Sequence, residues 1–140
     1  METKAEKPPQ DRFDYPLRDA HPYYMYENIH ATPEVLERCL SDESLGQLAE
    51  IAAEVKRRGL DHVYFVGCGT SLNEGKTVSY YVEEEAGLPA KAIDSLEFTG
   101  FPPPNLGEKS CVITISHSGN SITTIHAARF ARSRGAYVIS

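Results

Sequence analysis

From residue 62 onward, short apolar segments alternate with segments of helical pattern, and this alternation restricts the possible folds more than any other feature. The run HVYFVG is typical of a strand, and residues 72–86 have helical spacing that ends at Gly87. The expected strands are residues 62–67, 89–95, 111–116 and 136–140, with a second helix at about 121–134 and a turn-rich connection at 96–110. Short apolar strands separated by helices form a parallel sheet with helices on both faces. The predicted class is therefore α/β, a three-layer αβα arrangement.

The segments on either side of this alternation carry separate expectations. Residues 1–20 combine charges and prolines with few aliphatic side chains, so an extended or disordered tail is expected. Residues 21–60 are expected to form a helical lead-in of short helices, at 21–31, from Thr32 and Pro33, and from a capping box at Ser44 and Gln47. The strand at 136–140 has core character, and a parallel sheet rarely ends on an uncovered strand. We therefore expect residues 61–140 to be the N-terminal part of a larger domain.

Charge and cysteine content argue against several classes of protein. The net charge is −6, whereas nucleic-acid-binding surfaces are normally basic. No apolar run approaches the ~20 residues of a membrane helix, and the first residues have no apolar signal-peptide core. The three cysteines, Cys39, Cys68 and Cys111, are widely spaced and form no CxxC motif. This pattern favours a reducing cytoplasm over a disulfide framework or a zinc site. We expect a cytoplasmic protein with no metal, no cofactor, no nucleic-acid partner and no membrane partner.

Two loops with the same plan follow the first and third expected strands. GCGTS (residues 67–71) and SHSGNS (residues 116–121) each lie between the carboxyl end of a strand and the start of a helix. Ligands of open α/β sheets bind at this edge, and a helix N-terminus offers free N–H groups and a partial positive charge. Ser and Thr hydroxyls can donate to phosphate oxygens, and glycine lets the backbone approach closely. The two loops together indicate a phosphate-binding site that needs no Lys or Arg.

Two other interpretations of these loops stay open. The serines could be helix N-caps and the glycines turn residues, although two such loops after neighbouring strands favour a ligand site. A dinucleotide fingerprint, GxGxxG, would need Gly or Ala where this chain has Leu72, and Asp94 would then be the ribose-binding carboxylate. That pattern leaves SHSGNS unexplained, and neither loop continues into the GKS or GKT of a Walker A motif.

The motifs GCGTSLNEG, SLEF and ITISHSGNSITT, in this order, resemble the sugar isomerase (SIS) domain family. The similarity is to the double-SIS branch, which includes the isomerase half of glucosamine-6-phosphate synthase and the fructosamine-type deglycases. The run HPYYMYENIHATPEVLERCL resembles the helical lead-in of that branch, so the resemblance covers about residues 21–140. It implies a flavodoxin-like sheet, a homodimer, and a phosphorylated sugar or amino sugar as ligand.

The resemblance also implies roles for single residues. The phosphate loop of the family, SxSGxT, falls on Ser116, Ser118, Gly119 and Ser121. The CGTS motif falls on Cys68, Gly69, Thr70 and Ser71. Thr70 and Ser71 are expected to face the phosphate or sugar hydroxyls, and His117 is expected to contribute its backbone N–H. Three further residues are expected to line the site: Glu97, Asn120 and, as a small buried side chain, Cys68.

Similarity to this family implies aldose–ketose chemistry with a general-base Glu, assisted by a His and sometimes a Lys. In the family these groups lie past the fourth strand, so the catalytic residues are expected beyond residue 140 and none is assigned. The consecutive glutamates at 83–85 match by residue type alone. The whole protein is expected to isomerise, deglycate or aminate a sugar phosphate through an open-chain intermediate. The alternative is a non-catalytic module that senses sugar phosphates, and the third hypothesis is a dinucleotide-binding domain.

Overall fold

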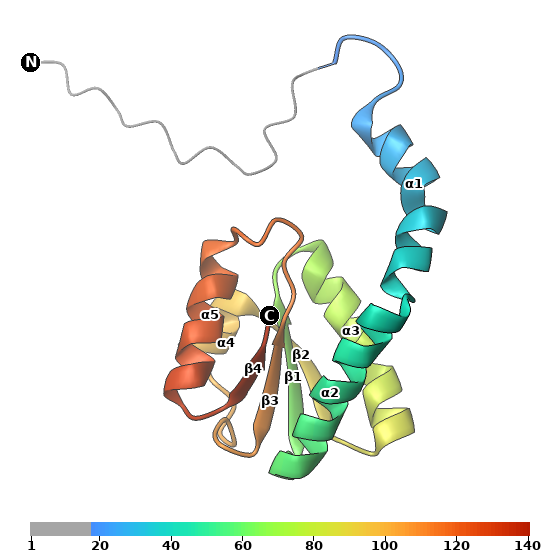
Figure 1. Cartoon of the computed structure of the whole chain (residues 1–140). Helices are drawn as coiled ribbons and strands as arrows, with labels where there is room; N and C mark the ends of the chain where they lie inside the picture. The colour runs from blue at the N-terminus through green and yellow to red at the C-terminus, as the bar shows by residue number, and fades with distance from the viewer. Residues whose placement is uncertain (1–17) are drawn as a thin grey trace, which may run out of the picture. The chain divides into compact units, whose positions relative to one another are not determined.

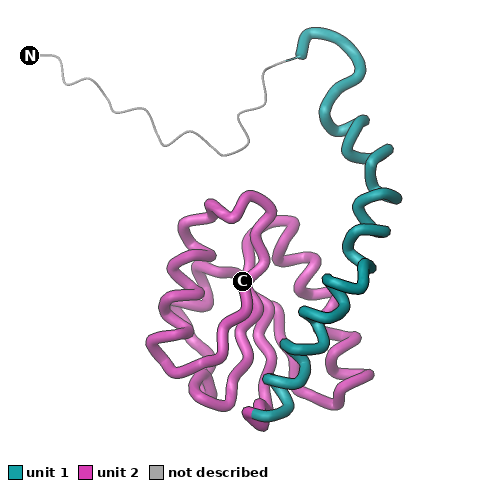
Figure 2. The backbone as a smooth tube through the Cα atoms, viewed as in Figure 1, with its two compact units in different colours: residues 1–57 teal, residues 58–140 magenta. Residues whose placement is uncertain are grey.

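The computed structural model describes residues 18–140, and the chain divides into two compact units, residues 1–57 and 58–140 (Figures 1 and 2). The second unit contains four parallel strands: β1 (His62–Gly67), β2 (Ala90–Asp94), β3 (Ser110–Thr114) and β4 (Tyr137–Ile139). Its helices are α3 (Thr70–Ala86), α4 (Ser95–Gly100) and α5 (Ile122–Ser133). The expected three-layer α/β class with a parallel sheet is confirmed. Residues 1–17, and with them most of the expected tail, lie outside the described part of the chain.

The strand order in the sheet is β2-β1-β3-β4. After β1 the chain forms the edge strand β2, and it then returns to the other side of β1 as β3. Val63 of β1 pairs with Ala90 on one side and with Cys111 on the other, while Cys111 pairs in turn with Tyr137. The connections that leave β1 and β3 therefore diverge, which makes the space above the carboxyl ends of these two strands the switch point of the sheet.

One face of the sheet carries the main hydrophobic core. Alternate residues of β1, Tyr64 and Val66, point to this face because successive strand side chains point to opposite sides. They pack with Phe98 of α4, and the small side chains of α5 let that helix approach closely. The buried cluster is Tyr64, Val66, Ile93, Phe98, Val112, Ala127, Ala131 and Ala136. Each fully buried large apolar side chain contributes about 1.5–3 kcal/mol, so this face supplies much of the stability of the unit.

Helix α3 covers the opposite face, on the other side of the sheet from α4 and α5 (Figure 1). Gly75 of α3 lies directly against the sheet. A Cβ atom at Gly75 would be 2.8 Å from Cβ of Phe65 and 3.5 Å from Cβ of Ala92. Glycine thus sets the spacing between α3 and the central strands, and this spacing fixes where α3 begins relative to the end of β1.

Between residues 18 and 58 the structure has two helices where the sequence predicted three. They are α1 (Tyr24–Cys39) and α2 (Asp42–Arg58), whose last residue is the first of the second unit. The predicted helix start at Thr32 and Pro33 is wrong, because α1 continues through Pro33 and the Thr32 hydroxyl donates to the Asn28 carbonyl one turn earlier. The predicted cap at Ser44 is also displaced, since α2 already begins at Asp42 and the Ser44 amide donates to the Ser41 hydroxyl.

The short helix α4 was not predicted and replaces the start of the expected turn-rich connection. Its first turn is capped by Asp94, whose Oδ1 accepts a hydrogen bond from the Leu96 amide at 2.8 Å. A carboxylate at this position also suits the positive end of the helix dipole. The helix places Ser95 and Phe98 in the interior, both with 0% of their surface exposed.

Candidate functional site

The two polar loops of the sequence lie side by side above the switch point of the sheet. The pairing of β1 and β3 continues beyond the strands, since the Ile115 amide donates to the Val66 carbonyl at 2.9 Å. Cys68 in the first loop and Ser121 in the second are then in direct contact, with 3.3 Å between Sγ and Oγ. Adjacent parallel strands with diverging connections are what bring these two segments to one place.

A pocket of about 410 Å³ lies between the two loops. Its lining residues are Cys68, Thr70, Ser71, Glu74, His117 and Ser118. Five of these six were candidates from the sequence, and they come in two groups, one following β1 and one following β3. Cys68 is exposed rather than buried, so that part of the sequence interpretation is wrong. The pocket therefore presents hydroxyl groups from both loops to one volume.

The hydroxyls of the second loop accept hydrogen bonds from their own backbone. Ser116 Oγ accepts from the Gly119 amide and Ser118 Oγ accepts from the Asn120 amide, each at 3.1 Å. Gly119 has a φ of +69°, a conformation that a side chain would strain, and it turns the loop tightly enough to make both contacts. A hydroxyl that accepts in this way keeps its hydrogen for another acceptor. Each of these two serine oxygens thus accepts one hydrogen bond and has its own hydrogen to donate.

The start of α3 supplies the second group of donors. α3 begins at Thr70 behind Gly69, and Ser71 in its first turn is 8% exposed and faces the pocket. The first amides of an α-helix have no acceptor within the helix, and the helix dipole places partial positive charge there. Hydroxyls combined with a helix N-terminus suit an anion with several oxygens, such as a phosphate group.

Glu74 is the one lining residue that the sequence analysis did not single out. It lies three and four residues after Ser71 and Thr70 in α3, which places all three side chains on one face of the helix. That spacing was readable in GCGTSLNEG and could have identified it. A carboxylate beside the hydroxyl donors can accept from sugar hydroxyls or from an amino group.

The other predicted site residues are distributed around this pocket. Gly69 occupies the N-cap position of α3, and Ser121 occupies that of α5. Glu97 lies elsewhere, in a hollow of about 480 Å³ that is also lined by Lys91 and Phe101. The structure brings the two loops together and places Glu97 apart from them.

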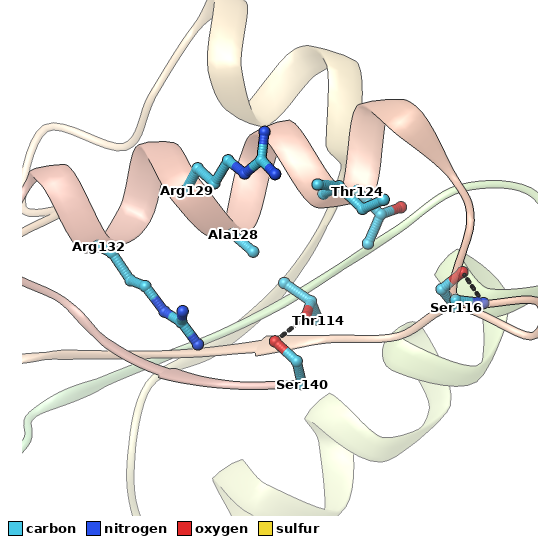
Figure 3. Close-up of a pocket in the computed structure, with 9 residues that line it drawn as sticks. Thr114, Ser116, Thr124, Ala128, Arg129, Arg132 and Ser140 are labelled. Carbon is cyan, nitrogen blue, oxygen red and sulfur yellow. Dashed lines mark hydrogen bonds between the residues drawn. The ribbon is translucent and has the colours of Figure 1, made fainter.

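A second hollow, of about 290 Å³, shares Ser116 and Gly119 with the polar loop and continues between α5 and β4 (Figure 3). Thr114 donates to Ser140 Oγ at 2.9 Å on its floor, and Arg129 and Arg132 of α5 line its far part. Both arginines are exposed. The loop at residues 116–121 is thus bordered by two hollows, one on each side of β3.

Glu83 is remote from both hollows of the polar loop. Its Oε1 accepts from the Ala90 amide at 3.1 Å, at the amino end of β2 and so at the opposite edge of the sheet. Within residues 18–140, no three His, Cys, Asp or Glu side chains are grouped closely enough to hold a metal ion. None of the described helices has the length and apolar character needed to cross a membrane.

Comparison with protein families identifies the family of this chain. A model of the SIS domain family matches residues 48–140, which include both loops and all four strands. The chain belongs to the SIS domain family. This confirms the resemblance that the loop motifs indicated, and it places the pocket at the sheet edge of an SIS domain.

Two curated relatives of this SIS chain illustrate the range of named activities. Fructosamine deglycase FrlB of Bacillus subtilis (strain 168) is 40% identical over 88 residues, covering 62% of this chain and 27% of the relative. A glutamine--fructose-6-phosphate aminotransferase of Tropheryma whipplei (strain Twist) is 40% identical over 123 residues, covering 84% of this chain and 20% of the relative. The SIS chain therefore spans about a quarter or less of the length of these relatives.

Solved structures show the same fold. Glucosamine-6-phosphate deaminase from Thermotoga maritima is 32% identical with a TM-score of 0.53, covering 59% of this chain and 26% of that one. Tagatose-6-phosphate ketose/aldose isomerase from Escherichia coli has a TM-score of 0.73 at 21% identity, covering 89% of this chain and 35% of that one. At the second identity the likeness concerns the fold alone.

Proposed function

We propose that this SIS chain binds the phosphate group of a phosphorylated sugar or amino sugar in the pocket between its two polar loops. The observation that carries the proposal is the convergence of Thr70 and Ser71 from one loop with Ser118 from the other on a single pocket. Hydroxyl donors that come from two directions can surround the oxygens of one phosphate group. Two unrelated helix caps would have no reason to face the same volume.

The sugar part of the proposal draws on the relatives. Their names specify a fructosamine deglycase, which is similar over 88 residues, and a fructose-6-phosphate aminotransferase, which is similar over 123 residues. We place the chain in a protein that isomerises, deglycates or aminates a sugar phosphate through an open-chain intermediate. We also propose that the catalytic base lies beyond residue 140, that the protein is a homodimer, and that it is cytoplasmic. Glu74 would then accept from a hydroxyl or an amino group of the sugar.

Dinucleotide binding is less favoured by the residues involved. Asp94, the carboxylate that would hold a ribose, instead caps α4 through the Leu96 amide. This contact assigns a structural role to the carboxylate that the dinucleotide hypothesis needs.

The proposal is tested by measuring the affinity of the chain for fructose 6-phosphate, glucosamine 6-phosphate and the unphosphorylated sugars by calorimetry. We expect binding of the phosphorylated sugars alone. Thr70→Val keeps the shape of the side chain but removes one donor to a charged group, so it should weaken binding about tenfold or more. Ser118→Ala should have an effect of similar size. NAD should give no heat of binding.

Thr77→Val is the matched control for Thr70→Val. Thr77 lies in the same helix and donates to the Asn73 carbonyl, away from the pocket lining. It should leave the affinity at the wild-type value. Equal affinity for fructose and its phosphate, or equal losses for the two threonine variants, would remove the phosphate assignment. Binding without turnover by the whole protein would favour the sensing module over an enzyme.

A further inference from the structure

A continuous row of hydroxyl groups runs from the interior of the second unit (residues 58–140, called the SIS unit below) to the loop at residues 116–121, the proposed phosphate loop. It begins at Ser95, the first residue of α4, which is 0% exposed. Ser95 Oγ donates to Thr123 Oγ1 at 2.8 Å, and Thr123 Oγ1 is 3.3 Å from Ser121 Oγ. Ser121 Oγ is in turn 3.3 Å from Cys68 Sγ in the other loop. The row therefore connects α4, α5 and both loops.

A second hydroxyl, that of Thr124, also contacts the Ser121 hydroxyl. Thr124, only 4% exposed, donates through Oγ1 to Ser121 Oγ at 3.0 Å. Ser121 occupies the N-cap position of α5, yet its hydroxyl is engaged by these side chains rather than by the amides of the first helical turn. The position of this hydroxyl is thus determined by Thr123 and Thr124, and not by capping.

Counting hydrogens gives the row a direction. Each hydroxyl has one hydrogen to donate and can accept two. Thr123 already accepts from Ser95, and Ser121 already accepts from Thr124. If Thr123 donates to Ser121, then Ser121 accepts twice and its own hydrogen is left for Cys68 or for a ligand. In the opposite direction the hydrogen of Thr123 would meet no acceptor among these groups. Every hydrogen has an acceptor when the row points from Ser95 outward.

We propose that Ser95 and Thr123 are positioning residues, which hold the Ser121 hydroxyl as a donor aimed at the ligand phosphate. This inference rests on the proposed function, because the phosphate is the ligand that the donor would meet. A thiol sulfur is a weak acceptor, whereas a phosphate oxygen is charged and accepts strongly. The sulfur of Cys68 therefore serves as the resting acceptor of Ser121, and a bound phosphate takes its place. Ser95 and Thr123 do not line the pocket between the loops, and Ser121 adjoins it through Cys68, which does.

The structural alternative is that Ser95 merely fastens α4 to α5. Ser110 provides a matched control for this alternative. It is also 0% exposed, and its hydroxyl donates to the Asn105 carbonyl and accepts from the Gly107 amide, at the amino end of β3. Ser95→Ala and Ser110→Ala each remove a buried serine hydroxyl that donates a hydrogen bond. They differ in whether that hydroxyl leads to the phosphate loop.

The experiment uses the full 140-residue chain and measures the dissociation constants of fructose 6-phosphate and of inorganic phosphate, together with unfolding in urea. Ser95→Ala and Thr123→Val should each weaken phosphate binding about fivefold, the effect of one misdirected hydrogen bond. Thr123→Ser keeps the hydroxyl and should therefore bind phosphate with wild-type affinity. Ser110→Ala should lower stability but keep wild-type affinity. Wild-type affinity in Ser95→Ala and Thr123→Val, or equal losses in Ser110→Ala, would overturn the inference.

A second measurement does not need a ligand. The outward direction of the row points the Ser121 hydrogen at the Cys68 sulfur, and a hydrogen bond donated to this sulfur favours its attack on an alkylating agent. In a Cys39→Ser background, Ser95→Ala and Thr123→Val should therefore slow iodoacetamide alkylation of Cys68 about fivefold, and Ser110→Ala should not. If the wild-type chain binds no phosphate, the proposed function fails and these rates decide alone. Unchanged rates would then overturn the positioning role.

Discussion

Cys111 is a buried thiol at the amino half of β3, with 1% of its surface exposed. Burial raises its pKa from 9.0 to about 11, because the charged thiolate is poorly solvated in the interior. The folded state thus holds the thiol proton more tightly than the unfolded chain does. Its contribution to stability is complete below about pH 9 and is lost as the pH rises toward 11.

We expect this effect to appear in the pH dependence of the unfolding free energies of the wild type and of Cys111→Ala. Between pH 9 and pH 11 the wild type should lose about 2–3 kcal/mol of unfolding free energy through this one group. Cys111→Ala should be less stable than wild type at pH 8, because a buried sulfur is lost, and the gap should narrow as the pH rises. Urea unfolding at a series of pH values tests this. A gap that is constant with pH would contradict it.

Residue chemistry was predictable from sequence only in part. The serines and threonines of the two loops were identifiable because their positions after apolar strands already implied a shared edge. Cys68 was predicted to be buried because free cysteines usually are. It is exposed, because its position at the end of β1 places it in the loop that lines the pocket. The bond between Ser95 and Thr123 joins residues 28 positions apart and depends on a helix that the sequence did not indicate.

At the scale of elements, the fit of α3 onto the sheet depends on Gly75. The Cβ of an alanine there would come within 2.8 Å of Phe65, so either α3 or the strand must shift. We expect Gly75→Ala to lower the unfolding free energy by about 1–3 kcal/mol, as overpacking does, despite the better helix propensity of alanine. Urea unfolding followed by circular dichroism measures the change.

Gly100 at the end of α4 is the control for that substitution. A Cβ added there meets no atom within 4 Å, and its φ lies outside the range that strains a side chain. Gly100→Ala should leave stability unchanged or raise it slightly. A loss at Gly100 as large as the loss at Gly75 would show that contact with Phe65 is not the cause.

The strands and the two long helices of the SIS unit were predicted to within about two residues, because each is bounded by a glycine or a change of hydrophobic period. Two features escaped. α4 has six residues, which is too short for a helical period to show, and the sequence after it is rich in proline. Thr32 and Pro33 were taken as a helix start because threonine is a common N-cap and proline is common at the first helical position, yet α1 continues through Pro33.

At the scale of the molecule, the two units differ in how they are stabilised. The SIS unit contains a buried cluster on its sheet, whereas α1 and α2, which are wholly within the described chain, contain no buried side chain. Helices of 16 and 17 residues are marginal in water without tertiary packing. The hydrophobic side chains of α1, such as Met25 and Ile29, remain exposed in this single chain.

Hydrogen exchange should reflect this difference. In a dilute solution of the chain, we expect the amides of α1 to exchange at least about 100-fold faster than those of β1 and β3. Mass spectrometry of peptic peptides resolves these segments. Protection of α1 that grows with protein concentration would report self-association. Protection equal to that of β1 at every concentration would contradict the expectation.

The adjacency of β1 and β3 also ties ligand binding to folding. Cys68 and Ser121 touch although 53 positions separate them in the chain, so the pocket cannot exist before the central strands pair. A phosphate ligand would bind the folded form alone, and the transition temperature would rise with ligand concentration by mass action. Bringing two residues so far apart in the chain together costs conformational entropy. Contacts between residues close in sequence do not offset this cost, so the pairing of β1 and β3 is expected late in folding. The rate at which phosphate affinity returns during refolding would therefore report the rate at which β1 and β3 pair.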